Sequence, residues 1–329
     1  MKIDGFLVLQ KIKNFSKNDK FLILSPKKID KKNCIENLKN KDTNTISRLI
    51  TAVENYPELH KETITKIKDI ASKSKTPVLG ITGTGGAGKS SLVTAFQRWS
   101  RFLETDAIAV NLDPGAERVH YDAEFDVRDL ISLTEVMTEY DLGPNGAQIL
   151  AADLLAAQAG DVAEQLHALS GELMIVDTPG QVELFAFREA SNHLIEVLGR
   201  NQSAIIYLFD PMLSRSPSGF VSQMLLSSIV EFRLGLPTKN FLSKSDLLEP
   251  EELEKILEWS ERLEILEMAL YDEAGGQRTE FAINQLRMMQ EFAQAPGLTP
   301  LSSELEEGLA DVLTFAPVSY THLTLPTKA

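Results

Sequence analysis

Short apolar runs alternate with longer amphipathic segments from residue 77 onward. The runs show little polar alternation, which is typical of strands that are covered on both faces in a parallel sheet. They predict strands over 78–82, 107–112, 173–176, 204–209 and 240–242. Between them, apolar residues recur at helical spacing, which predicts helices over 89–102, 147–169, 182–198, 221–234 and 251–271. The pattern therefore predicts an α/β fold, a parallel sheet with helices on both faces.

The N-terminal part of the chain follows a different pattern. Residues 1–45 are rich in Lys and Asn and predict an arm that is either solvated and poorly ordered or in contact with a polyanion. Residues 46–75 place apolar residues at helical spacing around Pro57 and predict a helical linker. Residues 1–75 carry 17 Lys and Arg against 9 Asp and Glu, whereas the rest of the chain carries 16 against 38. We therefore expect a basic, partly helical appendage before an acidic domain over 76–316.

Composition narrows the class of protein. The chain has 329 residues, of which 43% are hydrophobic, and its formal net charge is −14. That acidity disfavours contact with nucleic-acid phosphates. Cys34 is the only cysteine, which excludes an internal disulfide framework. Because the sequence shows no signal-like N-terminus and no apolar run of about 18 residues, we expect a cytoplasmic protein without a membrane segment.

The run Gly-Thr-Gly-Gly-Ala-Gly-Lys-Ser over 83–90 lies between the first predicted strand and the first predicted helix of the domain. This is the setting of a phosphate-binding P-loop, whose glycines let successive backbone N–H groups turn toward phosphate oxygens. Lys89 would reach the outer phosphates, and the Ser90 hydroxyl would ligate Mg²⁺ at the helix N-terminus. The residues expected to contact the nucleotide here are Gly85, Gly86, Ala87, Gly88, Lys89, Ser90 and Ser91. The substrate is therefore expected to be a nucleoside triphosphate.

A second element, Asp-Thr-Pro-Gly-Gln over 177–181, follows the predicted strand 173–176. In isolation it is compatible with a simple strand-ending turn. After an upstream P-loop it resembles a Walker-B-like and switch element, in which Asp177 would hold Mg²⁺ through water. Gln181 would then orient the attacking water. The expected reaction is therefore hydrolysis at the γ-phosphate.

A third element, Ser-Lys-Ser-Asp over 243–246, follows the last predicted strand and resembles the base-reading element of GTPases. The carboxylate of Asp246 can accept both guanine N1–H and the guanine amino group, and the stem of Lys244 would lie along the base. Ser243 stands where Asn or Thr is usual, which puts the supporting hydrogen bond in question. Ser303, within 299–303, lies where the last nucleotide element would meet the base carbonyl. Guanine is therefore the predicted base.

Three segments separate the P-loop from Asp177: Asn-Leu-Asp-Pro-Gly over 111–115, Asp-Val-Arg-Asp over 126–129 and Leu-Gly-Pro-Asn-Gly over 142–146. A Gly-Pro-Asn-Gly sequence alone predicts only a β-turn. In this order and spacing, however, the segments strongly resemble the GPN-loop GTPases, particularly the archaeal type, over residues 83–313.

The resemblance implies a homodimer in which the loop Gly143, Pro144 and Asn145 reaches across the two-fold axis, so that Asn145 completes the partner's site in trans. It also implies that Asp113 lies near Mg²⁺ and the hydrolytic water, with Gln181 positioning that water. The implied catalytic residues are Lys89, Asp113, Asn145 and Gln181, and the implied Mg²⁺ ligands are Ser90, Asp113 and Asp177. Arg128 has two interpretations of equal weight, a charge stabiliser and a helix-packing salt bridge.

Two functions remain open from this resemblance. The first is a Mg²⁺-dependent GTPase that drives the assembly of a client complex. The second is a nucleotide-gated interaction protein or assembly chaperone, in which turnover is slow and incidental. Hydrolysis that survives loss of Gln181 and Asn145 while dimerisation changes would favour the second.

Other stretches resemble different sequences. Residues 46–92 are similar to the linker and P-loop of the G-protein chaperone of cobalamin-dependent acyl-CoA mutases, which supplies a third hypothesis. Residues 317–329 resemble a translated sequencing-adapter tail, which predicts a non-native tail. Together these features suggest a spliced reading frame with a junction in or just after the P-loop; a genuine N-terminal extension is the alternative.

Overall fold

The computed structural model describes residues 76–169, 171–187, 189–273, 276–292 and 297–316. The predicted arm, the predicted linker and the predicted C-terminal tail all lie outside these residues. The described helices and strands belong to the acidic domain that the sequence predicts.

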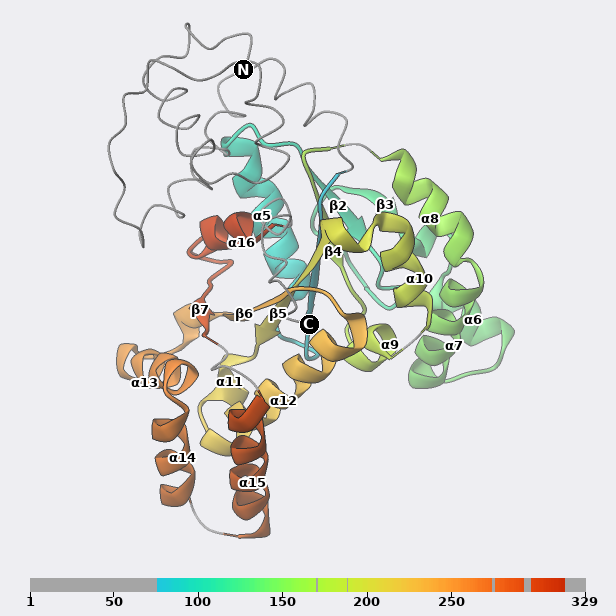
Figure 1. The fold of residues 1–329 in the computed structure, drawn as a ribbon. Coiled ribbons are helices and arrows are strands. Elements are labelled where there is room, and N and C mark those ends of the chain that lie inside the picture. Colours follow the sequence, from blue (N-terminus) through green and yellow to red (C-terminus); the bar gives the residue numbers. More distant parts are fainter. Residues whose placement is uncertain (1–75, 170, 188, 274–275, 293–296, 317–329) are drawn as a thin grey trace, which may run out of the picture. The chain divides into compact units, whose positions relative to one another are not determined.

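A seven-stranded sheet with the order β3-β2-β4-β1-β5-β6-β7 forms the centre of this domain (Figure 1). Every pair of neighbouring strands runs parallel. The strands are β1 Val78–Gly83, β2 Ala107–Asn111, β3 Ala123–Asp126, β4 Leu173–Asp177, β5 Ser203–Phe209, β6 Thr238–Leu242 and β7 Thr299–Pro300. The predicted parallel α/β sheet is confirmed, and each of the five predicted strands is present.

The sequence pattern missed two strands at the edges of the sheet. Phe125 is the only buried residue of the four in β3, and β7 has only two residues. An edge strand needs no continuous apolar run, because one of its sides does not pair and its faces are only partly covered. The apolar-run criterion therefore selects the central strands and passes over the edges.

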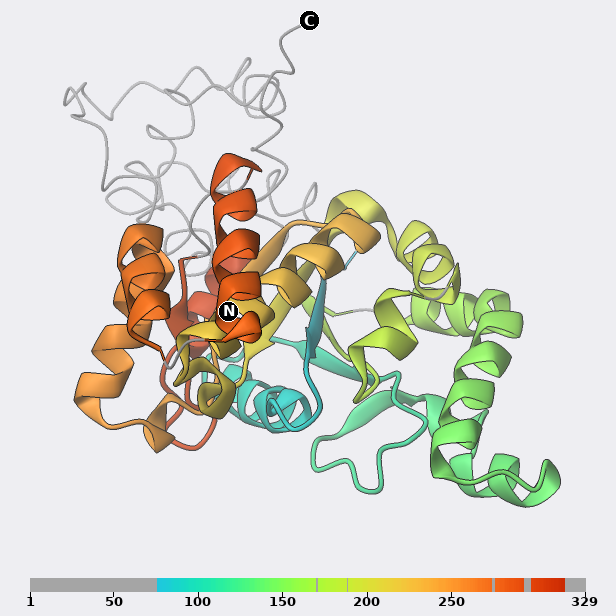
Figure 2. The ribbon, with the colours of Figure 1, turned by 90° about the horizontal axis from the view of Figure 1, so that it is seen from below.

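The helices in the described ranges are α5 Lys89–Phe102, α6 Leu133–Glu139, α7 Pro144–Ala157, α8 Ala159–Ala168, α9 Val182–Ala186, α10 Glu189–Leu198, α11 Pro211–Ser214, α12 Pro217–Leu234, α13 Pro250–Glu261, α14 Leu263–Asp272, α15 Gln277–Phe292 and α16 Leu309–Phe315. Figures 1 and 2 show α5 on one face of the sheet and α10 and α12 on the other. No helix within these ranges combines the length and apolar composition needed to cross a bilayer.

Three predicted helices are each divided in two. The predicted 147–169 becomes α7 and α8, which meet at Gln158, and 182–198 becomes α9 and α10. The predicted 251–271 becomes α13 and α14, because Arg262 adopts an extended backbone with φ −129° and ψ 91°. Helical periodicity does not reveal such a break, since the apolar spacing continues across it.

An aromatic series ties the C-terminal helices to the sheet. The rings of Tyr207 and Phe209 on β5 lie 5.6 Å apart, Phe220 of α12 follows at 5.7 Å, and Trp259 of α13 at 6.1 Å. All four side chains are almost fully buried. Aromatic pairs at these separations add to the stability that burial provides. This packing fixes α12 and α13 beside the strands whose carboxyl ends carry the site.

Candidate nucleotide-binding and catalytic site

The sequence elements with predicted chemistry meet at the carboxyl edge of the sheet. The P-loop follows β1, Asp113 follows β2, Asp177 ends β4 and Lys244 follows β6. Strand register brings Asp177 level with Ile81 on one side and with Asn111 on the other. Ligands of open α/β sheets bind at such carboxyl ends. The fold therefore gathers segments that are more than 150 residues apart in the chain, as the Ser243–Ala87 contact shows.

The P-loop encloses the side chain of Lys89. Gly86 and Gly88 adopt positive φ values of 78° and 96°, which glycine tolerates and other residues rarely adopt. Lys89 Nζ donates to the carbonyls of Gly83 (3.0 Å) and Thr84 (3.1 Å). Burial lowers the pKa of Lys89, and the nearby carboxylates of Asp177 and Asp113 oppose that shift. The ammonium is therefore already placed inside the loop that is expected to hold phosphates.

Lys89 also reaches the segment 177–181 at the end of β4, which we call the switch turn. Its Nζ donates to the carbonyl of Gly180 at 3.0 Å. Gly180 N–H donates in turn to Asp113 Oδ2 at 2.9 Å. Asp113 Oδ1 accepts from the N–H of Gly115, also at 2.9 Å. Burial is the largest influence on the Asp113 carboxyl and raises its pKa. The predicted residues Lys89 and Asp113 thus both hold Gly180.

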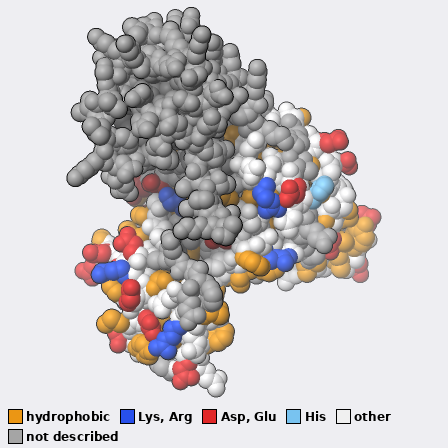
Figure 3. All heavy atoms as spheres, in the orientation of Figure 1, with side chains coloured by type: hydrophobic (Ala, Val, Ile, Leu, Met, Phe, Trp, Pro, Cys, Tyr) orange, Lys and Arg blue, Asp and Glu red, His pale blue; other side chains and the backbone are white. Residues whose placement is uncertain are grey.

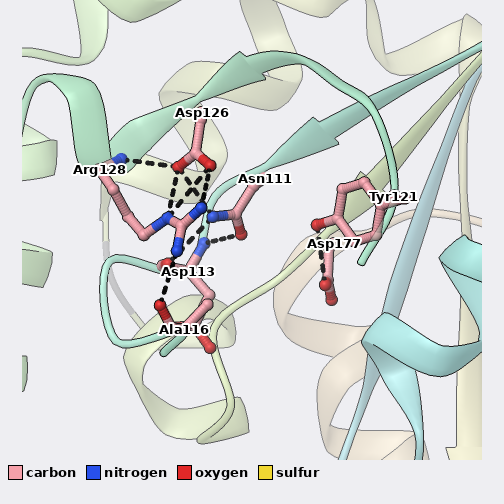
Figure 4. A network of polar contacts seen from close by, with 7 residues as sticks. All are labelled: Asn111, Asp113, Ala116, Tyr121, Asp126, Arg128 and Asp177. Atoms are coloured by element: carbon pink, nitrogen blue, oxygen red, sulfur yellow. Dashed lines mark hydrogen bonds and ion pairs between the residues drawn. The ribbon is translucent and has the colours of Figure 1, made fainter. Parts of the chain in front are cut away.

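Asp177 is almost completely buried at the end of β4. Its Oδ2 accepts a hydrogen bond of 3.0 Å from the hydroxyl of Tyr121, which Figure 4 shows pointing at the carboxylate. Its Oδ1 is buried without a hydrogen bond of normal geometry. Burial raises the pKa of Asp177 to about 6, and the nearby hydroxyls of Ser90 and Tyr121 oppose that rise. A buried carboxylate oxygen without a partner is a favourable ligand for a cation.

Mg²⁺ fits this donor set. Mg²⁺ prefers oxygen ligands and usually keeps several waters in addition to one or two protein groups and the substrate phosphates. Ser90 at the start of α5 and Asp177 supply a hydroxyl and a carboxylate of that kind. In the described part of the chain no three His, Cys, Asp or Glu residues cluster as a self-sufficient metal site. Any Mg²⁺ here would therefore depend on nucleotide oxygens and water.

Arg128 lies in a network at the end of β3 (Figure 4). It forms an ion pair with Asp126 at 2.6 Å, and its Nη1 donates to the carbonyl of Ala116 at 3.0 Å. Arg128 therefore forms a salt bridge, but the predicted helix-packing role is wrong, because the pair holds a loop and does not join two helices. Sequence spacing could not show this, because Ala116 lies in an irregular segment.

Gln181 contacts the helix that begins at the Gly-Pro-Asn loop. Its Nε2 donates to Gln148 Oε1 at 3.1 Å. Gln148 also lies close to the Asp113–Gly115 turn, since a Cβ at Gly115 would come within 3.1 Å of its Nε2. No sequence motif indicated Gln148, although its position three residues after Asn145 places both on one side of α7. Asn145 itself is exposed in the first turn of α7.

The predicted base-reading element packs against the P-loop. Ser243 Oγ donates to the carbonyl of Ala87 at 2.7 Å, with the Phe209 carbonyl at 3.0 Å. Lys244 Nζ donates to the carbonyl of Gly86 at 2.6 Å, and its stem passes over Gly88. Ser243, which stands where Asn or Thr is usual, therefore does make a supporting hydrogen bond: its hydroxyl connects the base-reading element to the P-loop.

Ser302 supports the side chain of Asp246. Its hydroxyl donates to Asp246 Oδ1 at 2.5 Å and accepts from the N–H of Leu305 at 3.0 Å. Ser302 is fully buried, whereas Asp246 is exposed and its other oxygen is available to a ligand. The residue predicted for this segment was the half-buried Ser303, whereas the contact to Asp246 comes from its neighbour Ser302. The role of Ser303 at the base stays a prediction.

Comparison with known proteins agrees with this geometry. A family model described as a conserved hypothetical ATP binding protein matches residues 81–322. A GPN-loop GTPase of the archaeon Pyrococcus abyssi is 31% identical over 242 residues, 72% of this chain and 95% of that protein. The chain belongs to the GPN-loop GTPases. GPN-loop GTPase 3 of Saccharomyces cerevisiae is 37% identical over 172 residues, 51% of this chain and 63% of the yeast protein.

The structural likeness of this GPN-loop GTPase to a solved relative is equally broad. The apo crystal structure of the Pyrococcus abyssi GTPase superposes with a TM-score of 0.67 at 29% identity, covering 78% of this chain and 99% of that one. The predicted fold class and the predicted GTP-hydrolysing activity are confirmed. The family description names ATP and the relatives are named GTPases; the Lys244–Asp246 element agrees with guanine. The mutase-chaperone hypothesis for 46–92 stays a prediction, since 46–75 lie outside the described residues.

Proposed function

We propose that this GPN-loop GTPase acts as a Mg²⁺-dependent homodimer in which Asn145 of each copy completes the site of the other. The contact between Gln181 and Gln148 carries this proposal. It links the switch turn to α7, the helix whose first residues are the Gly-Pro-Asn loop. A partner that engages the loop would thereby act on the residue that positions the attacking water.

The surface around the loop also favours a second copy. Leu130, Tyr140 and Ile149 are 39%, 48% and 47% exposed. Figure 3 shows hydrophobic side chains gathered over the end of the domain that carries α6 and α7. Apolar patches beside a functional loop are typical of protein–protein contacts, and a two-fold arrangement buries the same patch on both copies.

The catalytic step follows from where the charged groups lie. Lys89 and the P-loop N–H groups would stabilise negative charge on the β- and γ-phosphates. Gln181 and Asp113 would orient the water whose oxygen attacks the γ-phosphorus as the bond to the β-phosphate oxygen breaks. Mg²⁺, held by Ser90 and by Asp177 through water, would neutralise charge on the phosphate oxygens. Asp113 lies at the same carboxyl edge of the sheet as Asp177 and would bind a water molecule of the Mg²⁺ shell.

A mixing experiment tests the role of Asn145 in trans. Asp113→Asn and Asn145→Ala homodimers should each be nearly inactive. In an equilibrated mixture, half of the dimers are mixed and each has one complete site, so the activity should recover to about a quarter of the wild-type value. Native mass spectrometry would verify that the subunits have exchanged. Fully active Asn145→Ala protein, or no recovery in exchanged mixtures, would contradict the proposal.

A second candidate function, a nucleotide-gated interaction protein, is favoured by the helical pair α14 and α15. Met268, Tyr271, Phe281 and Met288 on this pair are 67%, 59%, 62% and 55% exposed. Flexible methionines suit surfaces that adapt to a client. Single-turnover GTP hydrolysis on Gln181→Ala and Asn145→Ala separates the two functions. Unchanged hydrolysis with altered dimerisation would favour the interaction protein.

A further inference from the structure

We propose that Asp126 and Arg128 form a positioning pair that holds the Asp113 turn in its catalytic geometry. Neither residue would touch the nucleotide. The inference rests on the proposed role of Asp113 in GTP hydrolysis, and it assigns Arg128 a function in the reaction that differs from direct charge stabilisation.

The pair has a defined geometry at the end of β3. Arg128 Nε donates to Asp126 Oδ1 at 2.9 Å and Nη2 donates to Oδ2 at 2.6 Å. The backbone N–H of Arg128 also donates to Asp126 Oδ1 at 2.9 Å, which caps the short 3₁₀ helix η2 Val127–Asp129. Two parallel bonds of this kind fix the guanidinium plane as well as its position. The side chain of Asp126 is 14% exposed and that of Arg128 is 31% exposed, so solvent screens the pair only in part.

Arg128 holds the C-terminal end of the Asp113 turn, which comprises residues 113–116. Its Nη1 donates to the carbonyl of Ala116 at 3.0 Å. The N–H of Ala116 donates back to the carbonyl of Asp113 at 3.3 Å, which closes the turn. The guanidinium therefore reaches the turn directly, through its last residue.

Asp126 holds the N-terminal end of the same turn through Asn111. Asn111 Nδ2 donates to Asp126 Oδ1 at 2.9 Å and lies 3.3 Å from the carbonyl of Asp113. Asn111 Oδ1 accepts from the N–H of Asp113 at 3.0 Å. A register shift between β2 and β3 places Asn111 opposite Asp126. The turn is therefore anchored at both ends to one carboxylate–guanidinium pair (Figure 4).

This anchoring has a consequence for the switch. The Asp113 carboxylate at the centre of the turn accepts the N–H of Gly180, the residue before the water-positioning Gln181. A displaced turn would move both the carboxylate and the switch N–H. Errors of about 1 Å in such groups reduce rates by about a hundredfold.

The same contacts disfavour Arg128 as a charge stabiliser on the phosphates. Each of its three guanidinium nitrogens is already engaged, two with Asp126 and one with Ala116. To reach a phosphate, Arg128 would have to break the pair, and loss of Asp126 would then release it and leave catalysis intact. The two roles therefore predict opposite effects for a change at Asp126.

The experiment compares Arg128→Ala, Arg128→Lys, Asp126→Asn and the double variant Asp126→Asn with Arg128→Ala in steady-state GTP hydrolysis and GDP binding. We expect each single variant to lower kcat by about tenfold to a hundredfold, with KM for GTP and GDP affinity within about twofold. The double variant should be no slower than the slower single variant, because the two residues act as one unit. Lys should not rescue, because it lacks the fork that joins Asp126 to Ala116.

Arg262→Ala is the matched control, since Arg262 pairs with Glu258 on the exposed surface of α13, away from the site. It should keep the wild-type kcat. Wild-type kcat in Asp126→Asn together with a slow Arg128→Ala, or rescue by Arg128→Lys, would overturn the positioning role. If Arg128→Ala fails to fold, Asp126→Asn and Arg128→Lys still decide between the roles.

Asp113→Asn separates this inference from the proposed function. If Asp113→Asn retains the wild-type kcat, the proposed catalytic role fails and the inference fails with it. If Asp113→Asn is slow while the Asp126 and Arg128 variants are not, only the positioning pair is wrong.

Discussion

Asp113 and Gly180 are joined by a hydrogen bond of 2.9 Å between the carboxylate Oδ2 and the backbone N–H, across 67 residues of sequence. Lys89 Nζ donates a hydrogen bond of 3.0 Å to the carbonyl of the same glycine. The switch turn is thus held by the P-loop lysine on one side and by the acidic residue after β2 on the other. The P-loop, the turn after β2 and the switch turn are therefore connected through Gly180.

The first prediction concerns Asp113→Asn. The carboxylate accepts from both Gly115 and Gly180, whereas an amide would oppose an N–H donor with its own NH₂ group. We expect kcat to fall by about a hundredfold, with GTP binding little changed. Single-turnover hydrolysis with saturating enzyme measures the chemical step. The exposed Asp272→Asn on α14 serves as the control, and equal rates for the two variants would contradict the assignment.

The second prediction concerns the pH dependence of stability without metal. The pKa of Asp177 has its ordinary value of 3.8 in the unfolded chain. In the folded protein burial disfavours the charged carboxylate and raises this pKa to about 6. The folded state therefore binds the proton more tightly, so the contribution of Asp177 to stability is lost as the pH rises from about 4 through 6. The loss amounts to about 3 kcal/mol.

Asp177→Asn removes this titration and should raise the free energy of unfolding of the metal-free protein at pH 7.5 relative to wild type. Urea denaturation in EDTA at pH 4.5 and 7.5 measures the difference. In the nucleotide-bound proteins, Mg²⁺ should reduce the difference in the free energy of unfolding between wild type and Asp177→Asn. It should leave the free energy of unfolding of Asp177→Asn itself unchanged. If the free energy of unfolding of the wild type rises relative to that of Asp177→Asn as the pH increases from 4.5 to 7.5, the assignment is contradicted.

The third prediction concerns the choice of base. Asp246→Asn should weaken GTP binding by about a hundredfold and favour xanthosine triphosphate, because the amide presents a donor where guanine also presents one. Ser302→Ala should produce a smaller loss, since its hydroxyl only supports Asp246 Oδ1. Competition binding with a fluorescent GDP measures both. Unchanged GTP affinity in Asp246→Asn would show that another group reads the base.

The fourth prediction concerns Gln148→Ala. Without the Oε1 acceptor at 3.1 Å, Gln181 loses its contact with α7. We expect kcat to fall by about threefold to tenfold with dimerisation unchanged, because a hydrogen bond of this kind contributes about 1 kcal/mol. Gln165→Ala on the exposed face of α8 is the control. Light scattering alongside the hydrolysis assay separates an effect on the switch from an effect on assembly.

Much of the phosphate site was predictable from local sequence. The P-loop, Asp177 and the Lys244–Asp246 element each lie at the carboxyl end of a strand with buried apolar residues. In a parallel sheet, strand order and strand direction bring such carboxyl ends together without further information. The same reasoning did not reveal that Ser302 supports Asp246, because only the turn after β7 sets the direction in which the Ser302 hydroxyl points.

The partners of Arg128 and Gln181 illustrate the other limit. Arg128 had two interpretations of equal weight in sequence, and its actual contacts are a carboxylate two residues away and a carbonyl in an irregular loop. Gln148 carries no motif, and its contact with Gln181 exists because α7 packs beside the switch turn.

The sequence by itself determined which chemistry this chain is expected to carry: a P-loop for phosphates, a carboxylate predicted to hold Mg²⁺ and an element predicted to read guanine. Each of these is encoded in a contiguous motif beside an apolar strand. Tertiary structure alone decided how these groups are held together, through Asp113 on Gly180, Arg128 on Ala116 and Ser302 on Asp246. Side-chain hydrogen bonds between distant segments depend on loop paths and strand register. Neither is set by the spacing of apolar residues.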